Sequence, residues 1–264
     1  PTPTTTTATP TPAPTTTTTA PATSTCTSPV WTTSQAGYKG FNDPAAVNGV
    51  GVGNYGQYMV DNNLWNAAGY NVSQTLRACD FNSWNVTTTA DNSTGDGAVK
   101  TYPNVHVDYI DWGTNKMPPL TNYSALDMRF AHRAPTTGGI WEFAFDIWLN
   151  GVGNGTANEL MIWTDNHGQT PWQTKVATVT LDGITWDLWK ANQGHYLALV
   201  PANGRVLTSG TLDLIPITNW LTANGHLPAG STLGAVDYGV EVVSTNGQPA
   251  RFDFTDFKLT ETRR

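Results

Sequence analysis

Glutamate is rare in this chain, and two of its four copies stand inside apolar runs. The four are Glu142, Glu159, Glu241 and Glu261. Glu159 opens the string Glu-Leu-Met-Ile-Trp, and Glu241 lies within residues 238–243, so both runs have the composition of β-strands. A carboxylate in such a place has partly lost its water, which raises its pKa and is costly unless the group is paired or used. Two such carboxylates facing each other are what glycoside hydrolysis requires.

The alternation of a β-strand decides which side chains could accompany these acids. Glu159, Met161 and Trp163 share one face of their run, and Glu241 points away from the apolar residues beside it. Asp146 also points away from its apolar neighbours, together with the tryptophan two residues later. If the three strands are neighbours in one curved sheet, acids and indoles line a single concave surface. Indoles stack on the apolar faces of sugar rings, so we expect a polysaccharide cleft.

The elements that must position these residues are mostly strands. Alternating patterns predict strands over residues 126–130, 143–148, 175–181 and 195–200. Turn dipeptides separate the strands, at Asn150-Gly151, Asp182-Gly183, Asn203-Gly204 and Asn246-Gly247. One helix is predicted over residues 217–227, with Thr218 as its N-cap. This pattern favours an all-β sandwich of jelly-roll type with one short helix.

The composition divides the chain into a spacer and one domain. Residues 1–25 are almost only Pro, Thr and Ala, so we expect an extended linker, typical of secreted proteins, that tethers another module upstream. Residues 26–264 fit one catalytic domain. Charged residues make up 12 % and the net charge is −7, which does not suggest a nucleic-acid or membrane partner. An even cysteine count favours one disulfide, Cys26 to Cys79, over two buried thiols.

Five short segments resemble glycoside hydrolase family 12, in the order in which that family has them. They are residues 63–65 (Asn-Leu-Trp), 100–104 (Lys-Thr-Tyr-Pro-Asn), 146–149 (Asp-Ile-Trp-Leu), 159–163 (Glu-Leu-Met-Ile-Trp) and 239–241 (Gly-Val-Glu). The resemblance implies a β-jelly roll of two antiparallel sheets with a concave cleft. It also implies a secreted, retaining endo-1,4-β-glucanase acting on β-glucan. We expect a monomer that needs neither a cofactor nor a metal.

The resemblance also assigns roles to single residues. Glu159 resembles the nucleophile and Glu241 the acid/base, while Asp146 is similar to the aspartate that supports the nucleophile and Met161 to the methionine packed beside it. Without the resemblance, Asp146 could be a cross-strand partner and Met161 ordinary core. Cys26–Cys79 resembles the family's single disulfide.

Aromatic residues supply the expected sugar contacts. Asn63 and Trp65 resemble the residues that hold the sugar on the non-reducing side of the cut, and we expect Trp163 to contact sugar as well. Trp112 and Trp172 are candidate platforms on loops. The sequence departs from the family where Val242-Val243 follow the acid/base in place of proline and an aromatic residue, on the side where the leaving group lies.

The implied mechanism makes demands on the two acids. Ionised Glu159 attacks the anomeric carbon while protonated Glu241 protonates the departing oxygen, so we expect a low pKa for Glu159 and a high one for Glu241. Retention requires carboxyl groups roughly 5–5.5 Å apart. Asp146 would help if it is protonated and donates to Glu159. We expect Glu142 at the rim or surface and Glu261 in solvent.

Two other functions remain open at this stage. A xyloglucan-specific endo-β-1,4-glucanase would use the same chemistry in a cleft wide enough for branched chains. A non-catalytic carbohydrate-binding module could use the same sandwich and tryptophans without cutting, but it would not need two glutamates converging in an apolar groove.

Overall fold

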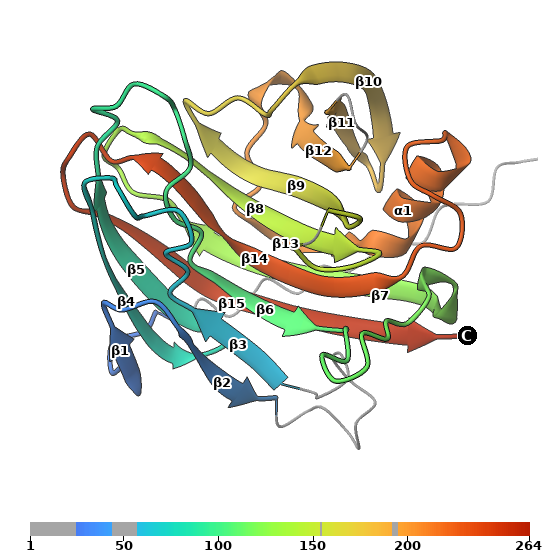
Figure 1. Cartoon of the computed structure of the whole chain (residues 1–264), viewed down its shortest axis with the longest axis horizontal. Helices are drawn as coiled ribbons and strands as arrows, with labels where there is room; N and C mark the ends of the chain where they lie inside the picture. Colours follow the sequence, from blue (N-terminus) through green and yellow to red (C-terminus); the bar gives the residue numbers. More distant parts are fainter. Residues whose placement is uncertain (1–24, 44–56, 154, 192–194) are drawn as a thin grey trace, which may run out of the picture.

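The computed structural model describes residues 25–43, 57–153, 155–191 and 195–264, and these form two packed sheets (Figure 1). Residues 1–24 lie outside the described residues, so the expected linker stays a prediction. The outer sheet has the order β1 (Trp31–Thr33), β4 (Val72–Asp80), β5 (Ser83–Ala90), β15 (Ala250–Arg263), β7 (Tyr123–Arg133), β13 (Ser209–Asp213). The inner sheet has the order β10 (Thr174–Leu181), β11 (Ile184–Lys190), β12 (Tyr196–Pro201), β9 (Asn158–His167), β8 (Ile140–Leu149), β14 (Leu233–Ser244), β6 (Asn104–Asp108), β3 (Gln57–Asp61), β2 (Tyr38–Asn42).

The expected all-β sandwich is confirmed, with one difference in strand direction. β12 runs parallel to β9, with Tyr196 opposite Glu159, whereas the other pairs in the two sheets are antiparallel. A parallel pair needs a crossover, which the hairpin of β10 and β11 provides, curling over one end of the sheet (Figure 1). This crossover places Tyr196 beside the strand that carries the expected nucleophile.

The core lies between the sheets and follows the predicted alternation. Phe143, Phe145 and Ile147 of β8 are fully buried in it, as are Leu160 and Ile162 of β9. The alternate residues of these strands therefore point to the opposite, concave face. Burying such side chains contributes about 1.5–3 kcal/mol each relative to exposure, which holds the floor of that face rigid.

The helix begins earlier than the sequence suggested. Helix α1 spans Leu214–Ala223, and its N-cap is Asp213, whose carboxylate accepts a bond from the Ile215 backbone N–H. Thr218, the expected N-cap, lies inside the helix and its hydroxyl donates back to the Leu214 carbonyl at 3.0 Å. The correction has a physical reason, because a carboxylate at the true N-terminus satisfies free N–H groups that a mid-helix hydroxyl cannot reach. Two 3₁₀ turns, η1 (Leu120–Asn122) and η2 (Ala202–Gly204), complete the helical elements of the described residues.

The predicted turns and the predicted disulfide are present. Asn150, Asp182, Asn203 and Asn246 all have φ between 50° and 61°, the left-handed conformation that Asn and Asp tolerate best after glycine. Cys26 and Cys79 form a disulfide that ties the start of the described chain to β4. No helix of the described residues is long and apolar enough to cross a membrane.

Candidate active site

Three neighbouring strands of the inner sheet position the expected acids. β8 lies between β9 and β14 (Figure 1). On β8, Asp146 stands opposite Met161 of β9, and Trp148 stands opposite Glu159. The strands of Asp146, Glu159 and Glu241 are therefore neighbours in one curved sheet, as a shared concave surface requires.

The two glutamates come from opposite sides of β8. Glu159 stands across from Trp148, whereas Glu241 stands across from Glu142, six residues earlier on the same strand. Their side chains nevertheless interact electrostatically, because the charge of Glu241 raises the pKa of Glu159. Charges of both glutamates also act on Asp146 between them. The carboxyl groups thus share one floor despite the staggered positions of their backbones.

The pKa of Glu159 differs from the expectation. Burial, and then the charge of Glu241, raise the pKa of Glu159 to about 7, so it is not low in the free protein. The pKa of Glu241 is also raised by burial, and a hydrogen bond from Glu142 acts in the opposite direction. No cation lies among the causes that shift the pKa of these two groups: loss of water raises both values, and the like charge of Glu241 raises that of Glu159 further.

The pKa of Asp146 is shifted in the direction that its expected role needs. It is 8 % exposed, and burial, followed by the charge of Glu159, raises its pKa well above the ordinary value. Trp148 donates a hydrogen bond to its side chain, and Oδ1 has no hydrogen-bond partner among the described residues. A neutral Asp146 can donate a hydrogen bond to Glu159 without adding a second negative charge, and it would thereby stabilise the ionised form of Glu159.

Small and sulfur-containing side chains make the floor beneath the acids. Met161 is 2 % exposed and packs with Trp163, Ala144 and Ala198. The Tyr196 hydroxyl donates to the Met161 sulfur at 3.4 Å. Trp163 is also only 2 % exposed, so little of its indole is left for a sugar ring and its expected sugar contact finds no support here.

Glycine in the segment Gly-Val-Glu allows the neighbouring antiparallel segment, residues 100–104, to approach closely. A Cβ on Gly239 would contact the Pro103 carbonyl oxygen and would lie 2.7 Å from the Asn104 Cβ. The Val240 N–H donates to that same carbonyl at 3.2 Å, and Tyr102 beside it donates to the Ala144 carbonyl at 3.1 Å. The Lys-Thr-Tyr-Pro-Asn segment therefore supports the strand of Glu241, which explains why these two motifs occur together.

The valines after Glu241 are structural. Val242 and Val243 are both fully buried. Val242 is joined to residues 100–104, since its N–H donates to the Thr101 carbonyl at 3.0 Å and its carbonyl accepts from the Lys100 N–H at 2.9 Å. Val242 packs in the core between the sheets, and neither valine has exposed surface with which to contact a sugar.

Two hollows run along the concave face, and Trp148 lines both. The first hollow, of about 560 Å³, is lined by Tyr38, Gln57, Met59, Asp61, Asn63, Asn104, His106, Asp108, Trp112, Trp148, Val152, Gly153, Ala235 and Asp237. The second, of about 520 Å³, is lined by Trp148, Gly153, Gly155, Ala157, Glu159, Trp172, Gln173, Ala191, His195 and Tyr196. Asn63 thus lines the first hollow and Glu159 the second, which gives an elongated site with the expected nucleophile on one side of Trp148.

The candidate platforms are distributed over both hollows. Trp112 lines the first and is 54 % exposed, with its indole N–H donating to Asp108 at 2.6 Å. Trp172 lines the second and is 63 % exposed. Trp65 is also 63 % exposed, and its backbone N–H donates to the Asn63 side chain at 3.0 Å. Open indole faces of this kind suit stacking on sugar rings.

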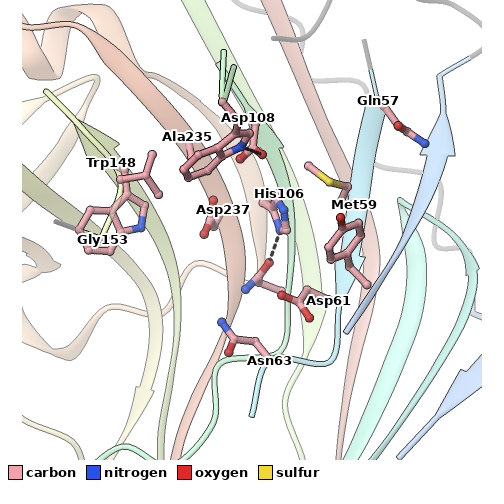
Figure 2. Close-up of a pocket in the computed structure, with 14 residues that line it drawn as sticks. Gln57, Met59, Asp61, Asn63, His106, Asp108, Trp148, Gly153, Ala235 and Asp237 are labelled. Atoms are coloured by element: carbon pink, nitrogen blue, oxygen red, sulfur yellow. Dashed lines mark hydrogen bonds between the residues drawn. The ribbon is translucent and has the colours of Figure 1, made fainter. Parts of the chain in front are cut away.

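A cluster of polar residues in the first hollow was not anticipated from the sequence. Figure 2 shows Asp61, His106 and Asp237 gathered on its floor, opposite Trp148. Burial raises the pKa of Asp61 to about 6 and raises that of Asp237 well above the ordinary value, while it lowers the pKa of His106. The alternation of Asn104–Asp108 could have indicated that His106 faces the cleft, but only strand order brings the three together.

Glu142 and Glu261 are both more buried than expected. Glu142, expected at the rim, is 0 % exposed, because it lies in the middle of a three-strand stretch directly across from Glu241. Glu261, expected in solvent, has a side chain only 2 % exposed and pairs with Arg263 at 3.0 Å. β15 continues to Arg263, so Glu261 belongs to a strand and not to a loose tail. Among the described residues, no group of three or more His, Cys, Asp or Glu side chains is arranged to hold a metal ion.

Comparisons with known proteins agree with this geometry. The family model described as "Glycosyl hydrolase family 12" matches residues 56–260. A xyloglucan-specific endo-beta-1,4-glucanase A from Emericella nidulans is 26 % identical over 70 % of this chain and 79 % of its own length. The structure of endoglucanase Cel12A from Rhodothermus marinus has a TM-score of 0.67 at 26 % identity, covering 88 % of this chain and all of that one. The xyloglucanase domain of NopAA from Sinorhizobium fredii, in complex with cellobiose, has a TM-score of 0.69 at 24 % identity and covers 89 % of this chain and all of its own; it supports the fold alone.

Proposed function

The chain belongs to glycosyl hydrolase family 12, and from this premise we propose that it is a secreted, retaining endo-1,4-β-glucanase that cuts internal bonds of cellulose-like or mixed-linkage glucans. That it is a glycoside hydrolase of the endoglucanase and xyloglucanase type follows from the family. A non-catalytic binding module is therefore excluded. The observation that carries the finer proposal is the shared floor of Glu159, Asp146 and Glu241 on three neighbouring strands.

In the first step, ionised Glu159 attacks the anomeric carbon and forms a glycosyl ester as the bond to the departing sugar breaks. Glu241 delivers its proton to the glycosidic oxygen, which leaves as an alcohol. In the second step, Glu241 removes a proton from water, the water oxygen displaces Glu159, and Glu241 regains its proton. Burial raises the pKa of Glu241, which favours the protonated form that the first step needs, and the charge of Glu241 adds to burial in raising the pKa of Glu159.

Asp146 supports the nucleophile in this scheme. A neutral Asp146 can hydrogen-bond to Glu159 in its ionised form and lower the cost of that charge. Met161, two residues from Glu159 on the same strand, packs with Trp163, Ala144 and Ala198 and is assigned to the place beside the nucleophile. Asn63, which lines the first hollow, and Trp65, which lines neither hollow, are assigned to the non-reducing side by the resemblance to the family, and Trp172 offers a platform in the hollow of Glu159.

Xyloglucan is the second candidate substrate. The Emericella nidulans relative is xyloglucan-specific by name, and the concave face of this chain is open along both hollows. Initial rates on carboxymethyl cellulose, mixed-linkage glucan and xyloglucan, measured side by side, distinguish the candidates. A kcat/KM for xyloglucan tenfold above the others would replace the first proposal by the second.

The proposal of secretion, of a linker to a further module and of a monomer extends beyond the domain itself. The disulfide supports an oxidising compartment. The Pro/Thr-rich residues 1–25 support a spacer. The expected partner is the polysaccharide alone.

Substitution of the nucleophile tests the catalytic assignment. Glu159→Gln should lower kcat on soluble glucan at least about a thousandfold, because no glycosyl ester can form. Asp182→Asn, at the exposed turn between β10 and β11, removes a carboxylate outside the cleft and should retain the wild-type rate. Unchanged release of reducing ends by Glu159→Gln would refute the assignment.

A further inference from the structure

Glu142 is a fully buried carboxyl group that the mechanism above does not use. It is 0 % exposed, although it lies on the concave side of β8 among the catalytic strands. The register of β8 and β14 places it directly across from Glu241. Cross-strand neighbours on one face have Cβ atoms about 4.5–5.5 Å apart, within reach of two glutamate side chains.

The partner of Glu142 is Glu241. The register and the effect of each side chain on the pKa of the other place the two carboxyl groups within reach of a hydrogen bond, and neither Glu142 oxygen has a hydrogen-bond partner among the described residues. Asn166, opposite Glu142 on β9, directs its amide to the Gln169 carbonyl at 2.8 Å. Two carboxyl groups can share a hydrogen bond only if one of them carries a proton.

The proton of this pair belongs to Glu142 when one group is ionised. Glu142 has no exposed surface, whereas Glu241 is half-buried and retains some contact with solvent. The titratable groups facing the pair are the carboxyls of Glu159 and Asp146 and the hydroxyls of Tyr102 and Tyr196. None of these is a cation, and Lys100 nearby donates to the Ala98 carbonyl instead. A charge on Glu142 would therefore be uncompensated and without water, so Glu142 is the neutral member.

We propose that Glu142 is a positioning residue that, as a neutral carboxylic acid, donates a hydrogen bond to Glu241, orients it and stabilises its ionised form. This proposal rests on the acid/base role proposed for Glu241. When Glu241 gives its proton to the glycosidic oxygen, the C–O bond breaks and the negative charge passes to Glu241. Glu142 keeps its own proton throughout, and its hydrogen bond strengthens as that charge develops.

Loss of the Glu142 donor should affect how readily Glu241 gives up its proton. Without the Glu142 donor, ionised Glu241 loses its stabilisation and holds its proton more tightly. Glu241 then stays protonated to higher pH but gives up the proton less readily. Substrates whose leaving group needs protonation suffer most, while an aryl glycoside with a highly acidic leaving group hardly depends on it.

The test compares Glu142→Leu with Glu142→Gln. In the leucine variant the basic limb of the kcat/KM–pH profile should move up by about one unit, and kcat on soluble glucan should fall at least tenfold. On dinitrophenyl β-cellobioside kcat should fall less than threefold. The glutamine variant, whose amide N–H can donate in place of the hydroxyl, should restore most of the rate on glucan. Asp182→Asn serves as the control for loss of a carboxyl group.

Several results would overturn the proposal. A basic limb that stays in place or moves down in Glu142→Leu, equal losses on both substrates, or a glutamine variant as slow as the leucine variant would each do so. If the leucine variant does not fold, infrared difference spectra of wild type minus Glu142→Gln at neutral pH decide, because a neutral Glu142 gives a protonated carboxyl band and an ionised one does not. Glu241→Gln separates this proposal from its premise: if it keeps full activity on glucan, the acid/base assignment itself fails.

Discussion

Four carboxyl side chains, Glu142, Asp146, Glu159 and Glu241, share the floor of one cleft, and burial raises the pKa of each. Not all can be ionised together, because each new charge in a place poor in water raises the cost of the next. Their roles follow from how exposed they are. Glu159 and Glu241 keep some exposure, as their proposed exchange of protons with substrate requires, while Glu142 and Asp146 are enclosed, which favours their neutral forms.

The coupling of the two catalytic glutamates predicts a shift in the acidic limb of the pH profile. Glu241→Gln removes the charge that helps to raise the pKa of Glu159 to about 7. The pKa of Glu159 should then fall, but it should stay above 4.5, because burial is the larger cause. Since Glu159 acts in its ionised form, the acidic limb of kcat/KM should move to lower pH.

Dinitrophenyl β-cellobioside is the substrate for this measurement, because it needs little help from the missing acid. An acidic limb that does not move, or that moves to higher pH, would contradict the coupling between Glu159 and Glu241. Asp182→Asn, in the exposed β10–β11 turn and lining neither hollow, should leave the limb in place.

Three strands and the segment of residues 100–104 beside them build the site. β8 supplies Glu142 and Asp146, β9 the proposed nucleophile Glu159 and β14 the proposed acid/base Glu241. The segment before β6 runs antiparallel beside β14 and approaches it closely at Gly239, where a Cβ would not fit. The position of Glu241, two residues further along β14, therefore depends on a contact made by a glycine.

Gly239→Ala tests this dependence. The added methyl group must displace the Pro103 backbone or the Asn104 side chain, which should cost about 1–3 kcal/mol. The midpoint of thermal unfolding should fall by roughly 2–4 °C for each kcal/mol, and kcat on glucan should fall because Glu241 moves with its strand. Gly155→Ala is the control for stability, since its added Cβ would meet nothing within 4 Å. Unchanged unfolding and kcat in Gly239→Ala would contradict this account of β14.

In the whole molecule, the two sheets have different roles. The inner sheet carries the cleft on its concave face, and the outer sheet covers its other face across the core. The disulfide belongs to the outer part, since Cys79 lies at the end of β4 and its partner precedes β1. We therefore expect the disulfide to affect the stability of the fold and not the rate of catalysis.

Replacement of Cys26 and Cys79 by serine tests this division. The bridge spans a sequence separation of 53 residues, which in the chain-entropy description corresponds to about 4 kcal/mol of stabilisation. The unfolding midpoint should fall by roughly 8–15 °C, while kcat at 25 °C on soluble glucan should stay within twofold of wild type. Reductant should lower the midpoint of the wild type and leave the double variant unaffected. A large loss of kcat at 25 °C would show that the disulfide also holds the cleft.

Much of this protein is determined by local pattern in the sequence. Alternation in residues 143–148 and 159–163 was enough to predict which side chains enter the core and which face the cleft, because a strand has a period of two whatever its surroundings. The turns at Asn150 and Asp182, and the Cys26–Cys79 bridge, were also predicted correctly. The start of the helix was missed, since Asp213 as N-cap depends on where the chain leaves β13.

Only the tertiary structure decided the environment of each acid. Glu142 was expected at the rim and Glu159 with a low pKa, and both expectations were wrong, because burial and like charge come from strands that are distant in the sequence. The cluster of Asp61, His106 and Asp237 arises from three different strands in the same way. The sequence by itself determines which way each side chain points from its strand. The order and stagger of the strands decide what each side chain meets, and hence whether a carboxyl group is ionised.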